Sequence, residues 1–150
     1  MKALDLGTGN GRYLLELAEL GYYAIGIDKR SWPIDDDVVR AISEGRIKIE
    51  VADALDYLRF CREKFDLVSI RYPDELGYHI YFTSLKDSFE FLNQVYRVLS
   101  NNGILLVVSR QDDYPYDDVV KAVEWTGLFR KDELKVDDLR NYELRFRKCV

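Results

Sequence analysis

The residue types that build metal clusters and disulfide frameworks are scarce in this chain, which has 150 residues but only two cysteines and one histidine. Cys61 and Cys149 are far apart and form no paired ligand spacing, so the sequence predicts neither a zinc site nor a disulfide framework. No apolar run is long enough to span a membrane. A strand pattern begins directly after Met1, which leaves no room for a secretory signal. We therefore expect a cytoplasmic protein with no metal site and no membrane partner.

Proline is also scarce, and neither charge is in strong excess. The chain has three prolines and no linker rich in Pro, Gly or Ser, so nothing marks a domain boundary. Its 22 basic and 27 acidic residues give a net charge of −5, which argues against a broad nucleic-acid-binding face. Because 47% of the residues are hydrophobic, the chain can bury a full core. We expect a single domain over residues 1–150.

Strand and helix patterns alternate along the sequence. Apolar runs predict parallel strands over residues 2–6, 22–27, 47–51, 65–70 and 104–109. Helical patterns predict helices over residues 10–20, 33–44 and 116–125, a helix that holds Leu55, Leu58 and Phe60, and one with a stripe of Phe89, Leu92, Tyr96 and Leu99. Charge-rich segments 128–136 and 141–150 predict a closing antiparallel pair. The predicted fold is α/β, with a mostly parallel sheet of about seven strands covered on both faces.

Two local signals predict where elements begin. Ser31 is the predicted cap of the helix over residues 33–44, and the acidic run 35–37 in its first turn complements the helix dipole. We interpret that run as structural rather than as a metal site. Asn101-Asn102-Gly103 predicts a turn into the strand over residues 104–109.

A glycine repeat, Gly7, Gly9 and Gly11, lies between the first strand and the first helix, where it lets a ligand approach the main chain closely. A dinucleotide fingerprint needs its third glycine at the position of Arg12, and a nucleoside-triphosphate loop needs a Gly-Lys-Ser/Thr ending, so neither is supported. Acidic residues follow two further strands, as Asp28 and Asp53. Since ligands of open parallel sheets bind beyond the carboxyl ends of the strands, these features predict one nucleotide-cofactor site.

In these motifs the sequence resembles the class I S-adenosylmethionine-dependent methyltransferases, over essentially the whole chain. The matching segments are residues 3–11, 26–28, 51–54, 65–68 and 98–106. The resemblance implies a three-layer Rossmann-like methyltransferase fold with S-adenosylmethionine as cofactor. Family members usually place helices ahead of the first strand, and this chain lacks them. We expect the loop over residues 71–83, or a second subunit of a homo-oligomer or a partner protein, to cover the cofactor.

The resemblance also implies a role for each residue of the site. Asp5 and the backbone of Gly7 and Gly9 would hold the methionine end of the cofactor, whose amino group needs an acceptor and whose carboxylate needs donors. Asp28 would accept from both ribose hydroxyls, and Asp53 from the adenine amino group, with the Ala54 N–H as donor to the ring. Thr8, Asn10, Gly11, Lys29 and Arg71 complete the predicted cofactor-binding set. The alternatives are that Asp5 only orders the glycine turn, and that Asp28 and Asp53 are helix caps or solvated acids.

The acceptor side is less clear in the sequence. Residues 71–74 do not match the Asn/Asp-Pro-Pro-Tyr motif of base amino methyltransferases. Residues 72–79 and 109–114 are remotely similar to the tRNA guanine-N7 methyltransferases, but the second proline, the tryptophan and the basic cluster of that family are missing. The candidate catalytic residues are Arg71 to steer an anionic acceptor, Tyr72 to stack on an aromatic one, and His79 as a base; ordinary roles in pairing, packing or solvation are the alternatives.

We therefore expect a methyltransferase that acts on a small-molecule acceptor. An RNA acceptor of the guanine-N7 type is the first alternative. The second alternative is an S-adenosylmethionine-binding module that has no activity of its own and works with a partner subunit.

Overall fold

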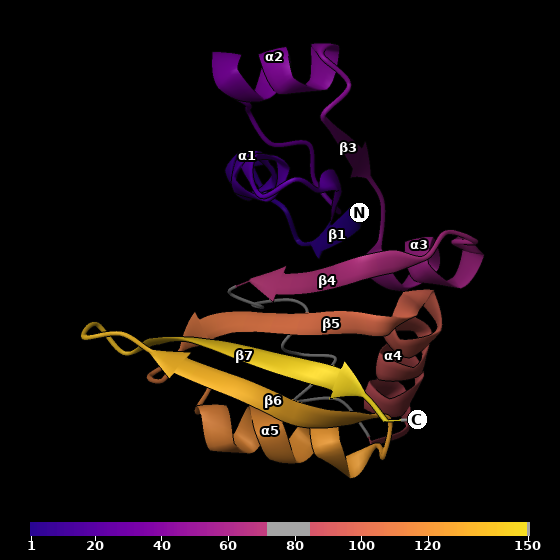
Figure 1. Ribbon diagram of the computed structural model, residues 1–150, viewed down its shortest axis with the longest axis vertical. Coiled ribbons are helices and arrows are strands. Elements are labelled where there is room, and N and C mark those ends of the chain that lie inside the picture. The colour runs from indigo at the N-terminus through magenta and orange to yellow at the C-terminus, as the bar shows by residue number, and fades with distance from the viewer. Residues whose placement is uncertain (72–84, 150) are drawn as a thin grey trace.

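The computed structural model describes residues 1–71 and 85–149. One sheet crosses this part of the chain, with the strands in the order β3-β2-β1-β4-β5-β7-β6 (Figure 1). Every neighbouring pair from β3 to β5 is parallel, and β7 is antiparallel to both β5 and β6. The strands are β1 (Lys2–Leu6), β2 (Tyr23–Asp28), β3 (Ile47–Val51), β4 (Phe65–Arg71), β5 (Leu99–Arg110), β6 (Phe129–Val136) and β7 (Asn141–Lys148). The predicted α/β fold with its closing antiparallel pair is confirmed.

Helices cover both faces of this sheet and make three layers. They are α1 (Arg12–Glu19), α2 (Asp36–Ser43), α3 (Ala54–Phe60), α4 (Leu85–Val98) and α5 (Tyr116–Trp125). One core joins α1 and α2 to the sheet through buried side chains that include Leu14, Leu17, Val38, Ala41, Leu67 and Leu106. The other core joins α3, α4 and α5 to the opposite face through Leu58, Phe91, Leu92, Val119, Val123, Ile27, Ile70 and Val107. Burial on both faces explains why the central parallel strands are mostly apolar, whereas β3 at the sheet edge alternates between apolar and charged residues.

The chain reverses its direction of winding at β1. From β1 it moves through β2 to β3 at one edge, then returns to β4 on the other side of β1 and continues to β5. The carboxyl ends of β1 and β4 therefore lie side by side, with Leu6 paired to Ile70. Such a reversal is where open α/β sheets bind their ligands, so the topology places a site beyond these two strands.

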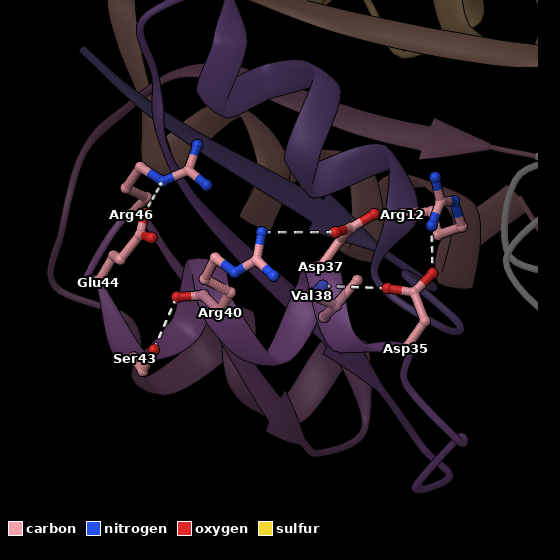
Figure 2. Close-up of polar contacts among 8 residues, drawn as sticks. All are labelled: Arg12, Asp35, Asp37, Val38, Arg40, Ser43, Glu44 and Arg46. Carbon is pink, nitrogen blue, oxygen red and sulfur yellow. Dashed lines mark hydrogen bonds and ion pairs between the residues drawn. The ribbon is translucent and has the colours of Figure 1, made fainter.

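The start of α2 differs from the prediction. The helix begins at Asp36, and Asp35 is its cap, because Asp35 Oδ1 accepts a hydrogen bond from the Val38 N–H at 3.0 Å. The prediction of Ser31 as the cap was wrong, since Ser31 lies before the extended segment that leads into the helix. The second carboxylate oxygen of Asp35 binds Arg12, so the cap also ties α2 to the start of α1 (Figure 2). Among the described residues, no group of three or more His, Cys, Asp or Glu side chains is arranged to hold a metal ion.

Other differences concern the start of β5, two exposed phenylalanines and the end of β4. Strand β5 begins at Leu99, which pairs with Phe65, and the register then shifts so that Leu67 pairs with Ile104. The predicted turn at residues 101–103 is therefore an irregularity inside a longer strand. Phe60 and Phe89, expected on buried stripes, are 82% and 41% exposed. The predicted loop also begins later, because Arg71 is the last residue of β4. No helix of the described ranges is long and apolar enough to cross a membrane.

Replacement of Gly26 by alanine is expected to destabilise the fold, because the added Cβ would lie 2.6 Å from Thr8 Cγ2 and Oγ1. Overpacking of a buried position costs about 1–3 kcal/mol, which urea denaturation measures. Thr8→Gly removes the clashing atoms and should restore part of the loss. Gly45→Ala is the control, because its φ of 73° makes it strained without any neighbour within 4 Å. A Gly26→Ala loss that Thr8→Gly leaves unchanged would contradict the packing explanation.

Candidate functional site

A buried carboxylate lies at the centre of the site. Asp5 is 1% exposed in β1, and its Oδ1 accepts a hydrogen bond from Ser69 Oγ of β4 at 2.7 Å. Asp5 and Ser69 are register partners, so their side chains meet on the same face of the sheet. Burial raises the pKa of Asp5 to about 6, while the Ser69 hydrogen bond, the nearby Thr8 hydroxyl and the positive charge of Arg71 oppose the increase.

The glycine loop that follows β1 is held by its own backbone. The N–H groups of Gly7 and Thr8 both donate to the Ile27 carbonyl of β2, at 2.8 and 3.0 Å, and the Gly11 N–H donates to the Thr8 carbonyl at 3.1 Å. All three glycines have positive φ, of 78°, 60° and 80° along the chain. A Cβ at Gly9 would meet nothing within 4 Å, so the loop leaves open space above Gly9. The Thr8 Oγ1 is buried near the Asp5 carboxylate, and it makes no hydrogen bond of ordinary geometry to any described residue.

Asp28 connects the end of β2 to this loop. Its Oδ2 accepts a hydrogen bond from the Gly9 N–H at 2.9 Å, and its Oδ1 accepts one from the Arg30 N–H at 3.0 Å. Each carboxylate oxygen has a second lone pair, so these bonds leave acceptor capacity on both oxygens. The carboxylate is half-buried at the carboxyl edge of the sheet, next to the loop after β1. Asp28 thus lies near enough to Asp5 for its negative charge to help raise the pKa of Asp5.

Asp53 lies one strand further towards the sheet edge. The Ala52 N–H donates to the Asp28 carbonyl at 2.8 Å, which keeps the ends of β2 and β3 together. Asp53 is the N-cap of α3, since its Oδ1 accepts from the Asp56 N–H at 3.1 Å, and Ala54 is the first residue of that helix. The cap role that we considered as an alternative is therefore present, while the second carboxylate oxygen remains available for another donor.

Arg71 lies on the opposite side of Asp5 from β2. It follows Ser69 by two residues in β4, so both side chains project from the same face of the sheet as Asp5. The guanidinium carbon of Arg71 lies 4.0 Å from the centre of the Tyr13 ring in α1, which is a cation–π contact. Burial raises the pKa of Tyr13 to about 12, the charge of Asp5 acts in the same direction, and the charge of Arg71 opposes both. The Tyr13 phenol is therefore protonated at neutral pH.

Several site residues were not found by sequence reasoning. Ser69, which bonds Asp5, could have been found as the polar residue inside an apolar strand. Tyr13 had no such signal, because its role depends on the packing of α1 over β4.

The remaining predicted residues are exposed or lie outside the described structure. Asn10 supports the first turn of α1, where its Oδ1 accepts from the Arg12 N–H at 3.1 Å. Lys29 is exposed beside Asp28. Tyr72, His79 and the motif over residues 72–79 lie outside the described residues.

The hydrogen-bond acceptors at this edge of the sheet fit an adenosine cofactor with an amino-acid tail. Two carboxylates, Asp5 and Asp28, can accept from an ammonium group and from ribose hydroxyls, and the Gly9 turn leaves the space for close approach. The fold and the site together define a Rossmann-like nucleotide-cofactor-binding domain.

A sequence model of the family described as "Methyltransferase domain" matches residues 1–136. The chain therefore belongs to the methyltransferase domain family, whose cofactor is S-adenosylmethionine.

Individual relatives are more distant. Polyamine aminopropyltransferase of Thermoplasma volcanium is 30% identical over 138 residues, which are 85% of this chain and 47% of that protein. Human EEF1A lysine methyltransferase 2 is 29% identical over 117 residues, which are 71% of this chain and 46% of that protein. The chain thus spans about half the length of these relatives. Among solved structures, the 1,6-didemethyltoxoflavin-N1-methyltransferase of Burkholderia thailandensis has a TM-score of 0.74 at 15% identity, with 99% of this chain and 71% of that chain covered.

Replacement of Asp5 by asparagine is expected to remove a pH dependence from the stability of the protein. Burial raises the pKa of Asp5 from its ordinary 3.8 to about 6, so between these values the folded protein binds a proton that the unfolded chain has lost. The free energy of unfolding of the unmodified protein should therefore fall as the pH rises through this window. A shift of this size corresponds to on the order of 2–3 kcal/mol, because each pKa unit is about 1.4 kcal/mol.

Urea denaturation of both proteins at about pH 4 and about pH 7 measures this difference. The introduced asparagine keeps an acceptor for Ser69, so the variant should lose the charge without losing the hydrogen bond. Asp56→Asn in α3 is the control, because that carboxylate is exposed. Equal pH slopes for Asp5→Asn and the unmodified protein would contradict the effect of burial on Asp5.

Proposed function

We propose that this protein transfers the methyl group of S-adenosylmethionine to a small-molecule acceptor. The observation that carries the proposal is the hydrogen bond between the Gly9 N–H and Asp28 Oδ2, because it joins the glycine loop to the acidic residue after β2. One connected surface then offers acceptors for the amino group and for the ribose hydroxyls of one ligand. Membership of the methyltransferase domain family supports the same ligand.

In this proposal the protein binds and orients the cofactor and the acceptor, and it needs no acid–base triad. Asp5 accepts from the methionine amino group, Asp28 from the ribose hydroxyls, and Asp53 from the adenine amino group beside Ala54. When bound, the cofactor supplies a sulfonium that already activates the methyl group for displacement. The protein contributes alignment and exclusion of water, and orientation alone supplies a large part of such rate accelerations.

The charge distribution favours a small acceptor over RNA. Two basic side chains of β7 face acidic partners on β6: Arg147 Nε lies 3.0 Å from Asp132 Oδ2, and Arg145 Nε lies 3.9 Å from Glu133 Oε2. Phosphate binding depends on uncompensated positive charge, and the net charge of the chain is −5. A guanine-N7-type RNA acceptor remains the alternative, carried only by the similarity of residues 72–79 and 109–114.

Two further alternatives concern the reaction itself. The relation to a polyamine aminopropyltransferase favours aminopropyl transfer as a second candidate. The other alternative is a binding module that works with a partner subunit. The chain spans about half the length of the two relatives named above. We favour methyl transfer by a single domain over residues 1–150, because the family that matches nearly the whole chain is a methyltransferase family.

Calorimetry with S-adenosylmethionine and S-adenosylhomocysteine tests the cofactor site. The unmodified protein should bind both, and Asp28→Ala should weaken binding by on the order of 2 kcal/mol, since the ribose hydroxyls lose their charged acceptor. Asp36→Ala, an exposed carboxylate in the first turn of α2, is the matched control and should bind normally. Thermal melting of each variant checks that the loop held by Asp28 has not unfolded. Binding of neither ligand by the unmodified protein would overturn the proposed function.

Incubation with methyl-labelled S-adenosylmethionine and pools of small molecules, polyamines and RNA then tests the acceptor. Label should appear in the small-molecule pool. Transfer of label only to RNA would support the guanine-N7-type alternative. Transfer of an aminopropyl group, detected by mass, would support the second candidate.

A further inference from the structure

The two glycine N–H groups expected to bind the carboxylate of the proposed cofactor already have partners within the protein. We expected the Gly7 and Gly9 N–H groups to bind that carboxylate. In the structure Gly7, Thr8 and Gly11 donate to main-chain carbonyls, and Gly9 donates to Asp28. A cofactor that keeps these bonds needs another donor for its negative end.

Arg71 lies where such a donor is needed. In β4 it projects from the same face as Ser69, whose hydroxyl bonds Asp5, so the Arg71 guanidinium and the Asp5 carboxylate flank one end of the site. The positive charge of Arg71 opposes the rise that burial causes in the pKa of both Asp5 and Tyr13. An α-amino acid carries an ammonium and a carboxylate on one carbon, so a carboxylate and a guanidinium side by side match it in charge and in order.

Tyr13 helps to position the guanidinium. The guanidinium carbon of Arg71 lies 4.0 Å from the centre of the Tyr13 ring, a cation–π contact. A guanidinium has five N–H groups, so it can keep this contact and bind a carboxylate in addition to other partners. The half-buried Tyr13 is itself fixed by α1, which makes the position of Arg71 depend on the core.

We propose that Arg71, held on the Tyr13 ring, binds the carboxylate of the cofactor's methionine end and thereby selects S-adenosylmethionine over its decarboxylated form. This inference rests on the proposed function. It also separates the two candidate reactions, because an aminopropyl group ends in an amine and has no carboxylate. A site that requires the carboxylate accepts a methyl donor and disfavours an aminopropyl donor.

Calorimetry with S-adenosylmethionine and decarboxylated S-adenosylmethionine tests the inference, since the two ligands differ only in the carboxylate. The unmodified protein should prefer the first by about 10- to 100-fold, the range expected for one charged hydrogen-bonded pair. Arg71→Met should remove this preference by weakening S-adenosylmethionine alone. Tyr13→Leu should reduce the preference, and Tyr13→Phe should keep it, because phenylalanine retains the ring. Arg40→Met in α2, an exposed arginine paired with Asp37, is the control and should bind both ligands normally.

The other outcomes also decide the matter. Equal affinity of the unmodified protein for both ligands, or an Arg71→Met variant that weakens both ligands equally or neither, overturns the inference and leaves the proposed function intact. Thermal melting identifies a misfolded Arg71→Met, in which case Arg71→Lys decides, since it keeps the charge but loses the planar fork and should show a reduced preference. Binding of neither ligand by the unmodified protein overturns the proposed function, and the inference with it.

Discussion

The burial of the Asp5 carboxylate in the centre of a parallel sheet is the constraint on which the rest of the site depends. A charge in that position is unfavourable unless hydrogen bonds and opposite charges compensate it. Ser69 on the neighbouring strand supplies the hydrogen bond, and Arg71 two residues later supplies the charge. Because both partners are in β4, the order of strands at the reversal point is also what makes the site possible. The geometry of the site therefore depends on the same strand pairing that builds the core.

The loop after β1 is built into this arrangement by close packing. Gly26 in β2 leaves the room that the Thr8 side chain fills, and the Ile27 carbonyl accepts from two loop N–H groups. Asp28 then holds Gly9 from the side. A loop fixed at this many points is organised before any ligand binds, so little conformational entropy is lost on binding. The same bonds use up N–H groups that the family resemblance assigned to the ligand, which moves the carboxylate-binding role towards a side chain.

Much of the fold could be predicted, and the failures have physical causes. The bounds of β1, β3 and α5 were correct to the residue, because the apolar run of β1, the alternating pattern of β3 and the helical period of α5 can each be seen within one segment. The cap of α2 was placed at Ser31, but Asp35 has a second partner in Arg12, a contact between helices that local patterns do not contain. Strand β5 was predicted too short because its first residues pair with Phe65 through a register shift. Errors arose where distant segments decide a local outcome.

The sequence by itself determined the class of the fold, the family and the acidic residues at the carboxyl edge of the sheet. Each of these depends on residue type and spacing within one segment, and these can be seen without the fold. Only the tertiary structure decided which atoms are engaged: that Ser69 supports Asp5, that Tyr13 carries Arg71, and that the glycine N–H groups are already bonded. These contacts join strands and helices far apart in the chain. Their geometry follows from sheet register and helix packing, which no single segment specifies.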